Sequence, residues 1–298
     1  MRYWKKRSVA NRTWVPFCLL LILALVSPAS PGGLATVAHA SPESNPIPKQ
    51  NPDKPSVQTE RRLAIIIDDF GNAMGGTEDM INLPVKLTVA VMPFMRTTAE
   101  DAKRAHERGH DVIVHLPMEP KQGRAEWLGP GAILSKMSDE EVRRKVEEAI
   151  DNVPYAAGIN NHMGSKITED KRVMGIILEV CMERGLFFVD SKTNYWSITS
   201  ELRASKGLPD LNNDIFLDDV HSIRHITGQL RKVQELLDQK GKCVAIGHVG
   251  VKGKITAAAL QQSIPELKAK GVKFVGISEL AREYYIPGTH SRPGFTLP

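Results

Sequence analysis

Short apolar runs alternate with longer amphipathic segments from residue 61 to about residue 284 of the 298-residue chain. Each run is rich in β-forming residues and is apolar along nearly its whole length, which is typical of strands covered on both faces. The runs occupy residues 63–68, 87–93, 111–117, 156–162, 186–191, 213–218, 243–249 and 272–278. This pattern predicts parallel strands joined by helices.

The segments between the runs carry helix-start signals. Ser138 and Glu141 have the spacing of a capping box, and so do Thr97 and Glu100. Repeated strand–helix units predict the α/β class, either as a (β/α) barrel or as a doubly wound open sheet. We favour a barrel of seven or eight parallel strands, either complete or incomplete. In both architectures, ligands bind at the carboxyl ends of the strands.

The first forty residues have the layout of a cleaved secretory signal peptide. A basic leader precedes the apolar run 15–26, and small residues ending in Ala38-His39-Ala40 follow it. An uncleaved N-terminal anchor is the alternative, although the apolar run is short for a membrane span. Residues 1–40 therefore predict an exported protein, periplasmic or otherwise extracytoplasmic, with no membrane span after signal cleavage.

The rest of the chain divides by composition. Residues 41–60 are rich in Pro, Ser and charge, which predicts a disordered linker. Residues 61–284 form the predicted barrel domain, and residues 285–298 a flexible tail. Cys181 and Cys243 lie in apolar contexts, so we expect buried free thiols rather than a disulfide.

The net charge of +5 resides in the leader. Residues 1–40 hold five basic residues and no acidic residue. The 39 Lys and Arg of the chain, less these five, balance its 34 Asp and Glu. This balance leaves no basic excess for binding nucleic acid.

Polar side chains suited to metal binding or proton transfer follow five of the predicted strands. They are Asp68-Asp69, His115, Asn160-Asn161-His162, Asp190 and His248. Each has an ordinary structural interpretation, such as a helix cap or a loop hydrogen bond. Together at one edge of a parallel sheet, they favour a functional cluster. Imidazoles and a carboxylate suit Zn²⁺ or a similar divalent ion, which would also offset the repulsion between two adjacent carboxylates.

In this order the residues resemble the motifs of the polysaccharide deacetylase superfamily, most closely its divergent branch, from about Leu63 to Leu280. Asp68 and Asp69 are similar to the first motif, in which the first Asp is the general base and the second a metal ligand. The run VAIGHVG, with His248, is similar to a late motif ending in a catalytic His. The resemblance implies a metal-dependent hydrolase that removes acetyl groups from a cell-envelope polysaccharide or peptidoglycan-like glycan.

Two positions depart from the family pattern. The run RGHDVIVHLPMEP keeps His115 but has Glu119 where the second His of the family motif stands. His162 lies in the region where the family carries an Arg, and we infer that it supplies the missing imidazole. The metal ligands implied are therefore Asp69, His115 and His162, with Glu119 as an outer partner of the site or an alternative ligand.

The resemblance also implies acid–base roles. Asp68 would take a proton from water, and His248, as imidazolium, would protonate the leaving amine, with Asp190 as the candidate that orients it. We expect substrate contacts from Asn161, Trp127 and Trp196, since a Trp in a strand-end loop can stack on a sugar, although it can equally pack its own loop.

Two other functions stay open from the residues alone. One is a catalytically degenerate protein that binds glycan or an envelope partner. The other is a metallohydrolase acting on a phosphoester or on an amide outside sugars.

Overall fold

The computed structural model describes residues 60–284. The predicted signal peptide, the predicted tail and all but the last residue of the predicted linker lie outside the described residues. The predicted barrel domain lies inside them. Within residues 60–284, none of the helices combines the length and the apolar character that crossing a membrane requires.

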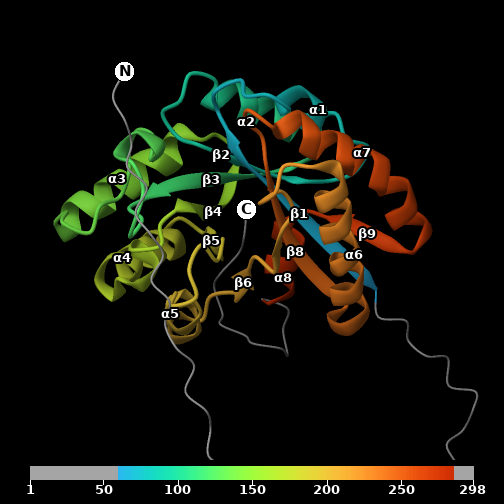
Figure 1. Cartoon of the computed structure of the whole chain (residues 1–298). Coiled ribbons are helices and arrows are strands. Elements are labelled where there is room, and N and C mark those ends of the chain that lie inside the picture. The colour runs from blue at the N-terminus through green and yellow to red at the C-terminus, as the bar shows by residue number, and fades with distance from the viewer. Residues whose placement is uncertain (1–59, 285–298) are drawn as a thin grey trace, which may run out of the picture. The chain divides into compact units, whose positions relative to one another are not determined.

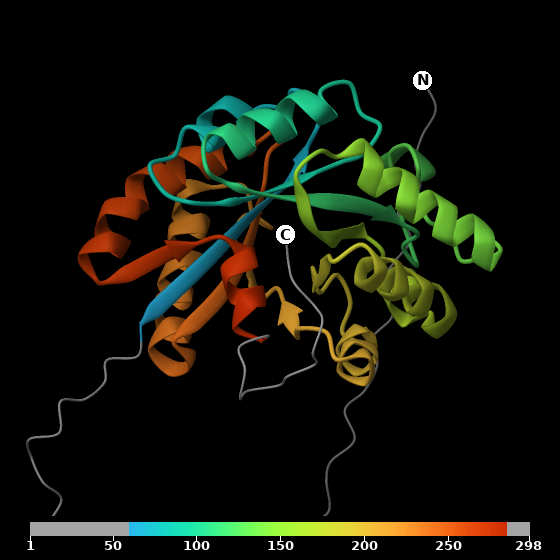
Figure 2. The same cartoon turned by 180° about the vertical axis from the view of Figure 1, so that it is seen from behind.

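The described part of the chain is built on one curled sheet of nine strands, all of them paired in parallel (Figures 1 and 2). The strands are β1 (Arg61–Phe70), β2 (Thr88–Val91), β3 (Asp111–Met118), β4 (Ala156–Met163), β5 (Phe187–Asp190), β6 (Leu211–Asn212), β7 (Ile215–Phe216), β8 (Lys242–His248) and β9 (Val272–Val275). Their order across the sheet is β6-β5-β4-β3-β2-β1-β8-β7, with β9 joined to β1 outside this path.

The two ends of this sheet, β6 and β7, are consecutive in the chain. The sequence predicted one strand over residues 213–218; the structure has only the two-residue β7 inside this range, and β6 ends just before it. The Asn213 N–H donates to the Asp190 carbonyl at 2.9 Å, whereas the Asp214 N–H donates to the Val244 carbonyl at 2.9 Å. Because neighbouring residues bind opposite ends of the sheet, the chain crosses the gap here instead of continuing as a strand. The fold is therefore a curled, incomplete (β/α) barrel, as predicted in preference to an open doubly wound sheet.

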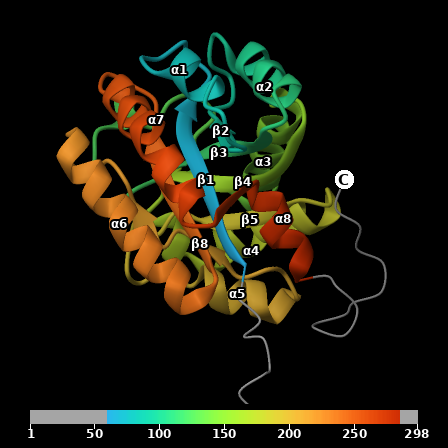
Figure 3. The same ribbon diagram turned by 90° about the vertical axis from the view of Figure 1, so that its right-hand side faces the viewer.

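Helices flank the barrel (Figure 3). They are α1 (Thr77–Ile81), α2 (Thr98–Glu107), α3 (Asp139–Asn152), α4 (Lys171–Glu183), α5 (Thr199–Lys206), α6 (Ile223–Lys240), α7 (Gly253–Ala269) and α8 (Ile277–Glu283), with 3₁₀ turns at Ala125–Trp127 and Ile167–Glu169. Ser138 caps α3 by accepting from the Glu141 N–H, as predicted. Thr97 precedes α2 but does not cap it, because its hydroxyl donates to the buried Asp101 carboxylate at 2.9 Å.

Apolar cores lie on both faces of the sheet. Along β1, Leu63, Ile65 and Ile67 belong to the core shared with helices α1–α7. Ala64 and Ile66 belong to the core inside the barrel, to which α8 contributes. Successive residues of a strand point to opposite faces, so this alternation also decides where each polar residue at a strand end points. Cys181 and Cys243 are buried and free, as predicted.

Two loops at the carboxyl edge of the sheet meet backbone to backbone. The loop after β1 contributes Gly75, the loop after β8 contributes Gly250, and Gly253 is the first residue of α7. The Gly250 N–H donates to the Gly75 carbonyl at 2.9 Å, and a Cβ added to Gly253 would lie 2.1 Å from the same oxygen. Only glycine allows this approach, which holds the ends of β1 and β8 together.

We predict that Gly253→Ala destabilises the protein by about 1–3 kcal/mol, because the two loops must separate. Gly175→Ala is the matched control. Gly175 lies inside α4 and an added Cβ there meets nothing within 4 Å, so alanine should stabilise the helix by roughly 0.5–1 kcal/mol. Urea unfolding of both variants measures the difference, and equal stability of the two would contradict the prediction.

Candidate metal centre

Five polar side chains meet inside the barrel at the carboxyl ends of its strands. Asp68 continues the inward row of β1, whose preceding member is Ile66. The corresponding inward rows of β3, β4 and β8 end in His115, Asn160 with His162, and His248. In the sheet register Asp68 lies beside His248, and His115 lies beside Asn160. The alternation of the strands thus delivers these groups to one place.

Asp69 reaches the same place by a different route. Regular alternation would turn it outward, away from Asp68. Its backbone instead has a left-handed φ of 69°, and the pairing of β1 with β2 shifts register between Ile67 and Phe70. This irregularity lets two adjacent carboxylates point into one site, a strained arrangement that is uncommon for a residue other than glycine.

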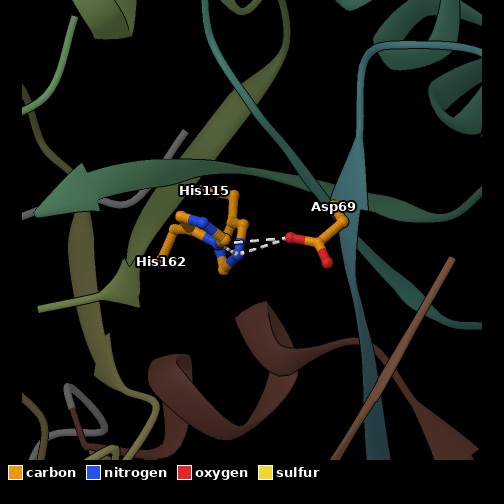
Figure 4. Close-up of side chains that lie close together, drawn as sticks. All are labelled: Asp69, His115 and His162. Carbon is orange, nitrogen blue, oxygen red and sulfur yellow. Dashed lines mark hydrogen bonds and ion pairs between the residues drawn. The ribbon is translucent and has the colours of Figure 1, made fainter. Parts of the chain in front are cut away.

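Asp69, His115 and His162 form a compact triangle of ligand atoms (Figure 4). The Asp69 Oδ1 atom lies 3.3 Å from His115 Nε2 and 3.2 Å from His162 Nδ1, and the two nitrogens are 3.1 Å apart. A tetrahedral ion with ligands at about 2.0–2.1 Å needs ligand atoms about 3.3–3.4 Å apart. The triangle therefore has the size of one face of such a site, with the fourth position left for water or substrate.

The other nitrogen of each imidazole contacts an acceptor. His115 Nδ1 lies 2.8 Å from Asn160 Oδ1, and His162 Nε2 lies 3.0 Å from the backbone carbonyl of Trp127. A neutral ring that donates there presents a lone pair to the centre. Asp69 Oδ1 is buried and has no hydrogen-bond partner among the described residues. Three acceptors thus converge without a donor, which fits a divalent cation.

Electrostatics at the triangle also favours positive charge. Burial alone would raise the pKa of Asp69, but His115 and His162 hold it below its usual range. Burial alone would lower the pKa of His115, but the charge of Asp68 and the contact with Asp69 raise it. The carboxylates that attract a proton to His115 would equally attract a cation.

Asp68 lies beside the triangle without joining it. Its carboxylate is buried, accepts a hydrogen bond from Asn160 Nδ2 at 2.8 Å and lies 3.7 Å from His115 Nδ1. Burial raises the pKa of Asp68 above its ordinary value, against the opposing charges of His115 and His248. A carboxylate with a raised pKa is a stronger base, which suits proton abstraction near neutral pH.

The carboxylate that orients His248 is Asp218, which corrects the expected pairing with Asp190. Asp218 Oδ1 lies 2.8 Å from His248 Nδ1, and its Oδ2 accepts from the His248 backbone N–H at 2.8 Å. Asp190 lies on the outward row of β5 and accepts instead from the hydroxyls of Ser197 and Thr199. Strand alternation turns Asp190 away from the site.

Asp218 has a direct consequence for the protonation of His248. Burial alone would lower the pKa of His248, but the hydrogen bond with Asp218 and the charge of Asp68 raise it to about 9. The imidazole is then protonated at pH 7 and loses its proton as the pH rises through about 9.

We predict that Asp218→Asn lowers this pKa toward the ordinary value of about 6.5, because the charged partner is lost. NMR titration of the His248 ring measures it. Asp219→Asn is the control, since Asp219 contacts His225 at 2.6 Å instead. A pKa that is the same in both variants would refute the role of Asp218.

Glu119 is not brought to the triangle. Its carboxylate accepts from the Ser135 N–H at 2.7 Å and pairs with Lys166 at 2.7 Å, which links the loop after β3 to the loop after β4. The expectation that Glu119 is an alternative ligand therefore has no geometric support.

Asn161 also takes a different place from the one expected. It lies on the outward row of β4 and is buried, accepting from the Ser191 N–H at 2.9 Å and donating to the Met163 carbonyl at 2.7 Å. These bonds hold two strand-end loops together and leave no side-chain group for substrate. Of the two adjacent asparagines, Asn160 is the one whose side chain lies in the site.

The tryptophans named from the sequence are exposed. Trp127 is 59% and Trp196 is 75% exposed, and they lie in the loops after β3 and β5. A cavity of about 420 Å³ is lined by Asp69, Asp218, His248 and residues 249–253, among others. The centre therefore opens to a space large enough for part of a ligand.

Sequence reasoning placed Asn160 in the strand-end cluster without a role, and it missed Asp218. Asn160 shares the inward row with His162, two residues later, so strand alternation was a signal that could have favoured it over Asn161. Asp218 follows the two-residue strand β7, and nothing in its local sequence marks it as the partner of His248.

Comparison with known proteins agrees with the fold. A protein of Agrobacterium tumefaciens C58, itself uncharacterized, has a solved structure that superimposes with a TM-score of 0.69, at 19% identity, over 74% of this chain and 88% of that one. This likeness concerns the fold alone.

Two curated relatives, both uncharacterized, are similar in sequence. YibQ of Escherichia coli (strain K12) is 35% identical over 208 residues, which are 69% of this chain and 63% of YibQ. A protein of Haemophilus influenzae (strain ATCC 51907 / DSM 11121 / KW20 / Rd) is 31% identical over 229 residues, 76% of this chain and 80% of the relative. Residues 65–281 match the model of the divergent polysaccharide deacetylase family, which covers most of the chain and every group of the site. The chain therefore belongs to the divergent polysaccharide deacetylase family.

Proposed function

We propose that this protein is an exported metal-dependent hydrolase that removes acetyl groups from a cell-envelope glycan. The observation that carries the proposal is the ligand triangle of Asp69, His115 and His162, flanked by Asp68 and His248. Membership of the family supports the reaction class. The signal-peptide layout of residues 1–40 supports export to the periplasm or another extracytoplasmic space.

Asp69 Oδ1, His115 Nε2 and His162 Nδ1 would hold the ion, for which Zn²⁺ suits the mixed nitrogen and oxygen donors. When bound, such an ion supplies a Lewis acid that polarises a carbonyl and lowers the pKa of water. The neighbouring residues of the chain then perform the proton transfers.

Asp68 takes a proton from the water that attacks the acetyl carbonyl. Burial raises the pKa of Asp68, which makes it a stronger base than the neighbouring Asp69. His248, protonated at pH 7 and held by Asp218, donates a proton to the leaving amine nitrogen. Acetate and a free amino sugar are the products for an N-acetyl group. The exposed rings of Trp127 and Trp196 offer apolar faces for sugar rings beside the site.

Two measurements on the purified protein test this proposal. Elemental analysis after dialysis should find about one zinc per chain, and acetate should be released from N- or O-acetylated glycans. No zinc, even after Zn²⁺ is added, would contradict the hydrolase. Zinc with glycan binding but without acetate release would instead identify a catalytically degenerate binding protein.

A further inference from the structure

Asn160 lies between the group that would hold the metal and the group that would act as base. Its side chain is fully buried. Oδ1 lies 2.8 Å from His115 Nδ1, and Nδ2 lies 2.8 Å from Asp68 Oδ1. A longer contact of 3.3 Å joins Nδ2 to the Ser191 hydroxyl. One amide thus contacts both functional groups with its two different ends.

The chemistry of these partners determines which way the amide faces. An ionised carboxylate can only accept, so the NH₂ end of Asn160 must face Asp68. The carbonyl oxygen then faces His115 and requires a proton on Nδ1. A neutral His115 protonated on Nδ1 has its lone pair on Nε2, which is the atom that faces Asp69 Oδ1 at 3.3 Å.

We propose that Asn160 is a positioning residue that holds Asp68 in place and selects the His115 tautomer able to bind metal. The neutral side chain of Asn160 thereby positions both Asp68 and the metal ligand His115. Asp68 receives this hydrogen bond from an amide and not from a charged side chain. The inference rests on the proposed metal centre and extends it to a residue that touches neither substrate nor metal.

Three variants of the full-length protein test this role. Asn160→Leu keeps the shape and removes both hydrogen bonds. Asn160→Asp keeps an acceptor for the His115 Nδ1 proton. Ser191→Ala is the matched control, because it removes only the 3.3 Å contact. Zinc affinity is measured by competition with a chromophoric chelator, and folding of each variant by circular dichroism.

We expect Asn160→Leu to bind zinc about 10–100-fold more weakly than the parent, as when a ligand loses its outer partner. Ser191→Ala should match the parent, and Asn160→Asp should bind zinc more tightly than Asn160→Leu. If Asn160 only packs the site, Asn160→Leu should bind zinc more tightly than Asn160→Asp, because leucine buries no charge. That order, or parental affinity in Asn160→Leu, would overturn the proposal.

A second readout needs neither zinc nor substrate. ¹⁵N NMR of the metal-free protein, titrated upward in pH until the His115 ring is neutral, should place the remaining His115 proton on Nδ1 in the parent and in Ser191→Ala. Asn160→Leu should lose this preference. A proton on Nε2 in the parent would refute the inference, even if the protein releases acetate. A proton on Nδ1 that depends on Asn160 would uphold it, even if no glycan is deacetylated.

Discussion

Removing either imidazole of the ligand triangle is expected to abolish stoichiometric zinc binding. His162→Ala leaves two of three ligand atoms, and His115→Gln does the same while it preserves volume at a buried position. Loss of an outer partner alone weakens metal sites about 10–100-fold, so loss of a ligand should exceed that range. Elemental analysis after dialysis should find zinc in the parent and none in either variant.

His106→Ala is the matched control for this experiment. His106 lies on α2, where its ring stacks on Tyr155 with centroids 4.2 Å apart, and it takes no part in the triangle. The variant should retain about one zinc per chain. Full zinc content in both ligand variants would show that zinc binds outside the triangle.

Replacing Asp68 separates the proposed reaction from metal binding. Asp68→Asn is expected to retain zinc and to release acetate about 10²–10⁴-fold more slowly, the usual cost of losing a general base. Zinc should remain because Asp68 is outside the triangle. The amide oxygen of the new side chain can still accept from Asn160 Nδ2, which lies 2.8 Å from the present carboxylate, so the site should keep its shape.

The comparison variant is Asp238→Asn, a carboxylate on α6 that pairs with Arg61 at 2.7 Å and does not line the cavity beside the site. It should turn over substrate at nearly the parental rate. Parental turnover in Asp68→Asn would exclude Asp68 as the base. If the parent binds glycan but releases no acetate, unchanged glycan affinity in Asp68→Asn would favour the degenerate binding protein.

The repeating order of strands and helices could be predicted because it depends on local patterns. Runs such as Leu63–Asp68 are apolar along nearly their whole length, which is typical of parallel strands covered on both faces. The family could also be predicted, because the Asp68-Asp69 pair and the runs that contain His115 and His248 occur in the order of the family motifs. The predicted membership of the divergent polysaccharide deacetylase family is confirmed over residues 65–281.

The expected sites at Asp190 and Asn161 were misjudged for one physical reason. A position near a strand end does not determine to which face of the sheet the side chain points, because successive residues of a strand point to opposite faces. Asp190 follows Phe188 on the outer row of β5, and Asn161 follows Ile159 on the outer row of β4. Counting from a known inward residue would have excluded both.

The sequence by itself determined the alternating architecture, the family and the identity of the residues that now form the triangle. Only the tertiary structure decided that Asp69 turns inward through a left-handed residue, that Asp218 rather than Asp190 contacts His248, and that Asn160 joins His115 to Asp68. Each of these depends on contacts between residues far apart in the chain. Such contacts depend on the curl and register of the sheet, which a local pattern of residues does not determine.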